Sequence, residues 1–192
     1  VINMSLGGGF LKRGQQGFHA LLNRVFQYAE QRGVTIVVAA GNSEYDMDHI
    51  ANAHITYCDQ THVICVSATG ATESGAGFGP FNDVDQFAFY SNYGSSRVDV
   101  AAPGGNYIPT ADGSSYVTAA WVYSLCPRTK LALVEGDLYY TSCSAFPTNL
   151  YLSGYAGTSQ ASPHVAGLAA LLVSEGVSSP SQIRHKITKG AD

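Results

Sequence analysis

The spacing of hydrophobic residues in the first 40 positions predicts a strand, a helix and a second strand. The apolar run "VINMSL" (residues 1–6) ends at three glycines, Gly7 to Gly9. Apolar side chains then recur with the period of one helix face, at Phe18, Leu21, Leu22, Val25, Phe26 and Ala29. Gly33 is placed to end that helix, and the β-branched run "VTIVVAA" after it is typical of a strand buried on both faces of a parallel sheet. This order is that of a βαβ unit.

The remaining patterns complete an α/β architecture. "HVICVSAT" (His62–Thr69) and "RVDVAAPGG" predict two further buried strands. "SQASPHVAGLAALLVSE" predicts an apolar helix, in which Pro163 is placed in the first turn, where the N–H groups have no helical partner. "SPSQIRHKITKG" predicts a last helix, with Ser179 as its N-cap and Pro180 at its first position. We therefore expect a three-layer sandwich, a mostly parallel sheet with helices on both faces.

The segment from about residue 110 to 150 has a different character. Its alternating Tyr, Val and Leu residues predict antiparallel strands or a hairpin. Cys126 and Cys143 bracket that hairpin and could join its ends by a disulfide. We interpret the segment as an insertion within one domain of residues 1–192.

Composition narrows the classes of function. The chain is 45% hydrophobic and 12% charged, which is typical of a globular protein with a core. A net charge of −4 without a basic run argues against nucleic acid or an anionic membrane as the main partner, and the longest apolar run is too short to span a bilayer. The chain has no initiating Met and opens inside a strand, so we expect upstream sequence and a fold truncated at its N-terminus.

The four cysteines bear on the compartment. None forms a C-x-x-C pair, so neither a zinc nor a redox motif is supported. Their even number in a chain poor in charge favours disulfides and an oxidising compartment, and hence a secreted or periplasmic protein. The alternative is that they are buried free thiols.

Candidate chemistry lies where the predicted strands end. In parallel sheets ligands bind outside the carboxyl ends of the strands, which selects Ser5–Gly9, Gly41–Asn42 and the loop before Ser159. A serine at the start of a helix could use its own backbone N–H to stabilise an oxyanion, and an Asn amide could donate to the same oxygen. The alternatives are local: Ser159 as a helix cap, Asn42 as a turn residue and a glycine-rich turn at residues 7–9.

The order and spacing of these motifs reduce the ambiguity. "VINMSLGG", "VVAAGN", "SNYG", "VDVAAPG" and "GTSQASPHVAGLAALL" together resemble the C-terminal part of the catalytic domain of subtilisin-like serine proteases, the subtilases. The resemblance covers residues 1–191 apart from about 110–150, with Gln160 where relatives commonly have Met. It implies a serine endopeptidase that hydrolyses polypeptides through an acyl-enzyme, without an organic cofactor. Asp99 stands where some relatives have a calcium ligand, which leaves calcium binding open; the alternative is a solvated carboxylate.

The resemblance also implies a role for each site residue. Ser159 corresponds to the nucleophile, and Asn42 to the oxyanion donor that works with the Ser159 N–H. Two wall segments are expected: Ser5, Leu6 and Gly7, which would pair with the substrate backbone, and Ala39, Ala40 and Gly41, which would line a roomy, mainly apolar pocket.

Two members of the expected catalytic triad are missing. The family places an Asp in D-[ST]-G and a His in H-G-T-H before the "SLGG" strand, and neither motif occurs here. We therefore expect the upstream half of the domain to supply both residues and the chain alone to be inactive. The alternatives are a catalytically inactive peptide-binding homologue, or a secreted structural domain that uses the Tyr-rich segment for adhesion. An α/β-hydrolase elbow is not supported, because Ala161 replaces its second Gly.

Overall fold

A four-stranded parallel sheet forms the centre of the molecule. The computed structural model describes residues 1–74, 81–110, 112–117, 120–125, 130–134, 137–141, 144–145 and 151–191. The sheet has the order β1-β3-β5-β8, made of β1 (Ile2–Met4), β3 (Ile36–Ala39), β5 (Ile64–Thr69) and β8 (Val100–Pro103). All three strand pairs are parallel. The predicted parallel sheet is confirmed, and the carboxyl ends of β1 and β3 lead directly to the two segments singled out in the sequence.

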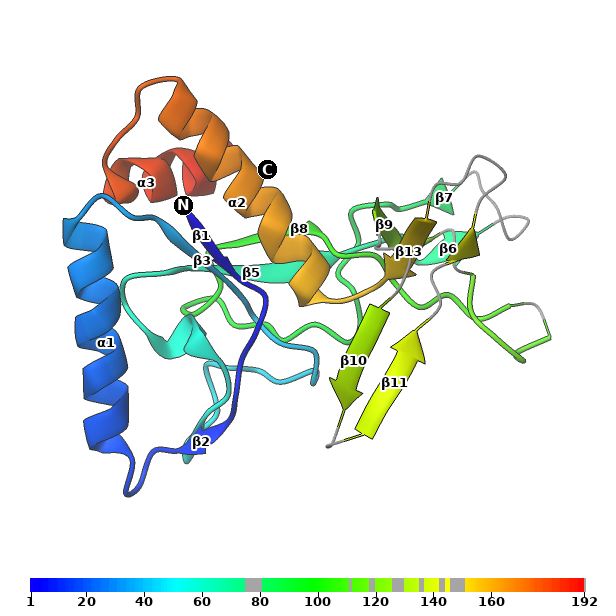
Figure 1. Ribbon diagram of the computed structural model, residues 1–192, viewed down its shortest axis with the longest axis horizontal. Coiled ribbons are helices and arrows are strands. Elements are labelled where there is room, and N and C mark those ends of the chain that lie inside the picture. Colours follow the sequence, from blue (N-terminus) through cyan, green and yellow to red (C-terminus); the bar gives the residue numbers. More distant parts are fainter. Residues whose placement is uncertain are drawn as a thin grey trace.

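Helices cover both faces of this sheet (Figure 1), as the sequence predicted. The helix α1 (Gln16–Gln31) lies on one side, and α2 (Thr158–Ser174) and α3 (Pro180–Gly190) lie on the other. The remaining elements before residue 110 are short: β2 (Phe10–Leu11), β4 (Ala53–His54), the 3₁₀ turn η1 (Tyr57–Asp59), β6 (Glu73–Ser74) and β7 (Phe81–Asn82). No described helix is long and apolar enough to cross a membrane.

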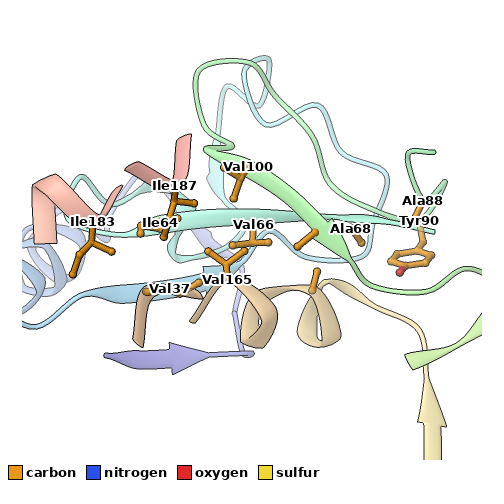
Figure 2. Close-up of a cluster of buried hydrophobic side chains, with 13 residues drawn as sticks. Val37, Ile64, Val66, Ala68, Ala88, Tyr90, Val100, Val165, Ile183 and Ile187 are labelled. Atoms are coloured by element: carbon orange, nitrogen blue, oxygen red, sulfur yellow. The ribbon is translucent and has the colours of Figure 1, made fainter. Parts of the chain in front are cut away.

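The alternation of side chains along the strands divides the core in two. Val37, Ile64 and Val66 face α2 and α3, where they pack with Val165 and Ile183 (Figure 2). The intervening residues point to the opposite face and pack with Phe26 of α1. When both faces of a strand are covered, neither set of alternating side chains contacts solvent. This explains why the sequence of these strands is continuously apolar.

The predicted α1 exists, but only the part of its apolar face around Phe26 and Ala29 packs against the sheet. Gly33 follows the helix with φ of +77°, as expected for a residue that ends a helix in the left-handed conformation. Of the six residues predicted to form the face, only Phe26 is buried, while Phe18, Leu21 and Val25 are 49%, 58% and 52% exposed. The sequence period found the helix correctly, but the docking of α1 onto β3 decided which side packs.

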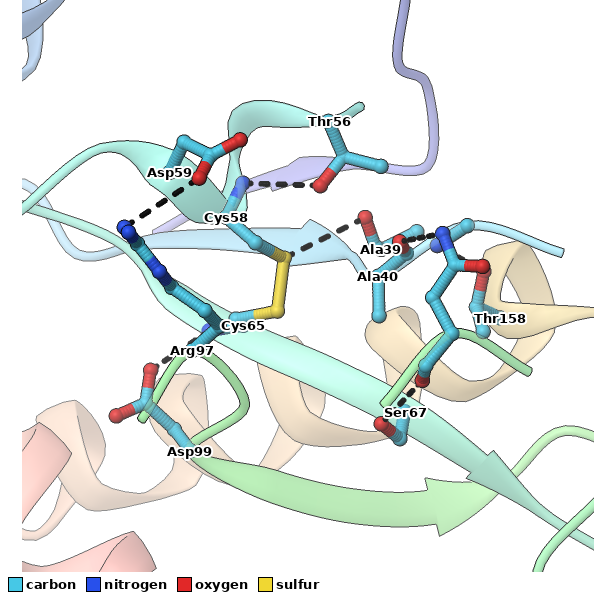
Figure 3. The surroundings of a disulfide bond; sticks show 12 residues. Ala39, Ala40, Thr56, Cys58, Asp59, Cys65, Ser67, Arg97, Asp99 and Thr158 are labelled. Atoms are coloured by element: carbon cyan, nitrogen blue, oxygen red, sulfur yellow. Dashed lines mark hydrogen bonds and ion pairs between the residues drawn. A yellow bond between two sulfur atoms is a disulfide. The ribbon is translucent and has the colours of Figure 1, made fainter. Parts of the chain in front are cut away.

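A disulfide connects two buried residues on the face of the sheet that α1 covers. Cys58 of η1 is bonded to Cys65 of β5, with their Cα atoms 5.2 Å apart (Figure 3). Both residues are buried, and the Thr56 hydroxyl accepts a hydrogen bond from the Cys58 N–H at 3.1 Å. The prediction of a disulfide is confirmed for this pair. Cys126 and Cys143 lie outside the described residues.

The described parts of the segment from 110 to 150 contain antiparallel strands, as predicted. The strands β10 (Lys130–Val134) and β11 (Asp137–Thr141) form a hairpin. The strand β13 (Tyr151–Tyr155) lies between β12 (Ser144–Ala145) and β9 (Val122–Leu125). Because β13 leads through two residues into α2, this antiparallel region lies beside the start of that helix (Figure 1).

Candidate active site

The nucleophile candidate lies in the first turn of α2. The helix begins at Thr158, and Gly157 is the capping residue before it. Ser159 is therefore the second helical residue, and the alternative in which it serves only as the cap is wrong. Its side chain is half-buried, and its hydroxyl lies 3.4 Å from the backbone oxygen of Ser5. Among the described residues its backbone N–H has no hydrogen-bond partner, which leaves this donor available at the positive end of the helix.

Asn42 is held against the same turn. Its side-chain oxygen accepts hydrogen bonds from both the N–H and the hydroxyl of Thr158, each at 2.9 Å. The Thr158 hydroxyl in turn accepts the Gly41 N–H at 3.0 Å. Because its oxygen is fixed on Thr158, the amide of Asn42 presents its NH₂ group as a donor. Asn42 is thus more than a turn residue, because it connects the end of β3 to the start of α2.

A buried asparagine shapes the loop that carries Asn42. Asn92 is fully buried, and its amide nitrogen donates to the backbone oxygen of Ala40 at 2.8 Å. Its side-chain oxygen accepts the N–H groups of Ser43 and Tyr45, both at 3.0 Å. Gly41 passes this point with φ of +97°, and a Cβ there would meet the Asn92 amide nitrogen at 2.6 Å. Only glycine fits this position.

The two predicted wall segments line one pocket. Its volume is about 400 Å³. Of the predicted site residues it is lined by Leu6, Gly7, Ala39, Gly41, Asn42 and Ser159. Two others do not line it: Ala40 is fully buried beneath the loop, and Ser5 lies at the edge, in contact with Ser159. Ile55 and Thr56, which the sequence reasoning did not single out, form a further part of the wall. The lining mixes apolar and polar groups, whereas a mainly apolar pocket was expected.

Comparisons with known proteins agree with this geometry. The model of the subtilase family matches residues 1–192. The chain belongs to the subtilase family. Thermitase of Thermoactinomyces vulgaris is 32% identical over 192 residues, which are 100% of this chain and 46% of thermitase. Subtilisin-like protease 2 of Pseudogymnoascus destructans is 31% identical over 188 residues, which are 97% of this chain and 32% of that protein.

Solved structures support the same fold. A cold-adapted subtilisin-like serine proteinase aligns with a TM-score of 0.56 and 26% identity, over 97% of this chain and 46% of that one. A lanthipeptide protease aligns with a TM-score of 0.64 at 22% identity, over 95% and 51%, which shows the fold alone. This subtilase chain thus spans about half or less of the length of these relatives.

None of the histidines of this subtilase chain is close enough to line the pocket of Ser159. All six belong to the described part of the chain, and none is among the residues that line that pocket. His164 is exposed and points to another cavity, between β8, α2 and α3. His49 and His62 pair with acidic residues, His19 stacks on His54, and His185 is exposed on α3. The described residues therefore provide a candidate nucleophile and candidate oxyanion donors, but no histidine beside them that could act as the base.

Asp99 of this subtilase does not fit a calcium ligand. Its carboxylate accepts the Cys65 N–H at 2.8 Å and pairs with the guanidinium of Arg184 at 2.5 Å. Both oxygens are engaged, one of them by a cation, and the side chain is only 11% exposed. The alternative of a solvated carboxylate is therefore wrong. Within the described residues, no group of three or more His, Cys, Asp or Glu could hold a metal ion.

Sequence reasoning missed the residues that orient Asn42. Thr158 was read only as part of the serine motif, and Asn92 only as part of "SNYG". Thr158 is fully buried, and a polar residue directly before a candidate nucleophile was the available signal. For Asn92 the sequence carries no such signal, because its three partners lie about 50 residues away in the chain.

Proposed function

We propose that this chain is part of a serine-type endopeptidase that hydrolyses polypeptides through an acyl-enzyme. Ser159 is the nucleophile. The Asn42 amide and the Ser159 N–H stabilise the oxyanion that forms when the hydroxyl attacks a peptide carbonyl. The observation that supports the proposal is that Asn42 and Ser159 line a single pocket at the start of α2.

The base and its orienting acid come from the upstream half of the catalytic domain. The relatives named above are about twice the length of the chain or longer, which supports this part of the proposal. A serine hydroxyl is a weak nucleophile without a neighbouring base, so the isolated chain is inactive. In the complete protein a histidine takes the Ser159 proton and later delivers it to the leaving amine.

The substrate is an extended polypeptide whose backbone lies along residues 5–7. This segment continues β1, which among the described residues pairs only with β3, so its other edge is available for main-chain hydrogen bonds. The side chain before the scissile bond enters the pocket of about 400 Å³. Leu6, Ala39 and Ile55 favour an apolar side chain there, and the polar residues of the wall tolerate others.

The protein acts in an oxidising compartment and is secreted or periplasmic. The Cys58–Cys65 disulfide supports this, because such bonds persist outside the cytosol. A relative from Xanthomonas campestris pv. campestris bears the name extracellular protease. Calcium binding is a separate proposal that the contacts of Asp99 do not favour at that residue; a site elsewhere would be found by calcium titration followed by calorimetry.

The test compares the full-length product of the gene with residues 1–192 alone. The full-length protein is expected to hydrolyse a peptide substrate and to react with a fluorophosphonate, and Ser159→Ala to abolish both. Asn42→Ala is expected to lower kcat by about 10²–10³-fold, a range measured on subtilisin, itself a member of this family. The isolated chain is expected to show neither activity. Labelling of the isolated chain that disappears in Ser159→Ala would contradict the need for an upstream base.

The second candidate is a peptide-binding homologue without activity. The absence of a histidine at the Ser159 pocket in the described residues is the observation that favours it. A full-length protein that binds peptides but neither hydrolyses them nor reacts with a fluorophosphonate would establish this alternative and refute the endopeptidase proposal.

A further inference from the structure

Pro163 removes one backbone hydrogen bond from α2, and the residue that loses its partner is Ser159. In an α-helix the N–H of each residue bonds to the backbone oxygen four positions earlier. Proline has no N–H, so the oxygen of Ser159 receives no bond from position 163. Since α2 begins at Thr158, Pro163 lies in the second turn, where this bond would otherwise form. The expectation that Pro163 lies in a first turn without helical partners was wrong.

The hydroxyl of Ser5 replaces the missing donor. It donates to the backbone oxygen of Ser159 at 2.8 Å, from a residue 154 positions away in the chain. This distance is that of a good O–H···O hydrogen bond. The contact is also reciprocal, because the Ser159 hydroxyl approaches the Ser5 backbone oxygen at 3.4 Å. The segment after β1 and the first turn of α2 are therefore linked through the backbone and side chain of both serines.

The surrounding network fixes the direction of this bond. The Ser5 oxygen also lies 2.9 Å from the Asn3 amide nitrogen and 2.9 Å from the Ser162 hydroxyl. A serine hydroxyl has one proton and two acceptor sites. The nitrogen of the Asn3 amide can only donate, and the Ser162 hydroxyl can donate into the second acceptor site. The single proton of Ser5 is then committed to Ser159, whose carbonyl can only accept.

We propose that Ser5 is a positioning residue for the nucleophile: its hydroxyl supplies the hydrogen bond that Pro163 denies to the Ser159 carbonyl. This inference rests on the proposed function, because it treats Ser159 as the nucleophile. The role expected of Ser5 from the family resemblance was to bind the substrate through its backbone, and the side-chain role is separate from it. The bond holds the Ser159 backbone, and with it the oxyanion-donating N–H, against the segment that binds substrate.

The test is a double-mutant cycle between Ser5 and Pro163 in the full-length protein. Ser5→Ala is expected to lower kcat by about tenfold with little change in KM, because small displacements of a reacting group are costly. Pro163→Ala restores an N–H at position 163. In that background the same Ser5→Ala change is expected to cost about threefold or less, because the helix itself then holds the Ser159 carbonyl.

Ser162→Ala is the matched control. This substitution removes a hydroxyl from the same cluster, but the Ser159 carbonyl loses no hydrogen bond through it. Its effect on kcat is expected to be the same in the wild-type background and in the Pro163→Ala background. The urea midpoint of each variant is measured in parallel, so that a loss of fold is separated from a loss of positioning.

The outcomes separate the two proposals. An equal loss of kcat for Ser5→Ala in both backgrounds, or a loss confined to KM, would overturn the positioning role while leaving the endopeptidase intact. Full activity of Ser159→Ala would refute the proposed function and with it the catalytic role of Ser5. This result can be told apart from a failure of the positioning role, because the Ser159→Ala variant leaves Ser5 and Pro163 unchanged.

Discussion

The side-chain oxygen of Asn42 accepts both the N–H and the hydroxyl of Thr158, each at 2.9 Å. These residues are 116 positions apart, and the contact joins the loop after β3 to the first residue of α2. It holds the oxygen end of the amide on Thr158, which leaves the NH₂ end to act as a donor. A donor held in advance of the reaction needs no reorganisation when charge develops, which is the main source of oxyanion stabilisation.

The first prediction concerns this contact. Thr158→Val keeps the shape of the buried side chain but removes its hydroxyl from Asn42 and from the Gly41 N–H. We expect kcat of the full-length protein to fall by about tenfold with a smaller change in KM, because the Asn42 amide loses one of its two anchors. Thr158→Ser retains the hydroxyl and is the control. Equal kcat values for the Val and Ser variants would contradict the assigned role.

The second prediction concerns the Cys58–Cys65 disulfide. Cys58→Ala combined with Cys65→Ala is expected to lower the free energy of unfolding by about 2 kcal/mol, because the short loop between them is no longer closed in the unfolded chain. Urea denaturation under oxidising conditions measures the difference from the wild type. Peptide mapping without reductant provides the check, since it must recover the 58–65 link. An unchanged urea midpoint would show that this bond contributes nothing to stability.

The third prediction concerns the pH dependence of stability through His54. Burial lowers the pKa of this residue below 6.5, and Asp59 acts in the opposite direction, while His19 and Lys12 lower it further. The His54 ring is stacked on that of His19, with centroids 4.1 Å apart, and Arg97 shares the Asp59 carboxylate. The unfolded chain therefore binds a proton at His54 at a higher pH than the folded chain does.

The sign follows from this difference. The contribution of His54 to stability is fully present above its unfolded pKa of 6.5 and is lost as the pH falls below that value. Urea unfolding from about pH 7.5 to about pH 5.5 should therefore show a smaller loss of stability in His54→Gln than in the wild type. His49→Gln is a control for which the opposite change in pH dependence is expected, because Asp46 raises the pKa of His49. Parallel pH profiles for wild type and His54→Gln would refute the prediction.

The fourth prediction is that residues 1–192 alone associate with themselves. Val1 and Ile2, at the start of the edge strand β1, are 46% and 47% exposed, and α1 exposes apolar side chains around Leu21 and Val25. Bare apolar surface and unpaired strand edges favour association. Light scattering at increasing concentration is expected to show oligomers, and Leu21→Glu with Val25→Lys to reduce them without changing the circular dichroism. A monodisperse monomer that unfolds cooperatively would be the contrary result.

Much of the fold could be read from local patterns. The run "VTIVVAA" predicted a strand buried on both faces because helices must cover each side of a parallel sheet, and β3 is buried along its length. Ser179 and Pro180 marked the start of α3 correctly, although the described contacts show no capping hydrogen bond from Ser179 to the helix backbone. The part of the apolar face of α1 that would be buried was not predictable, because the surface on which the helix docks is formed by residues far along the chain.

The sequence by itself determined the four strands of the central sheet, the three helices and, through the family resemblance, the candidate groups Ser159 and Asn42. The spacing of hydrophobic residues and the residue types at turns are local features, so they can be recognised from a short stretch of sequence. Only the tertiary structure decided that the Thr158 hydroxyl orients Asn42, that Asn92 shapes the loop, and that Ser5 serves the Ser159 carbonyl. Hydrogen bonds between such distant segments depend on the register of the sheet and on where α2 docks, and no local pattern specifies either one.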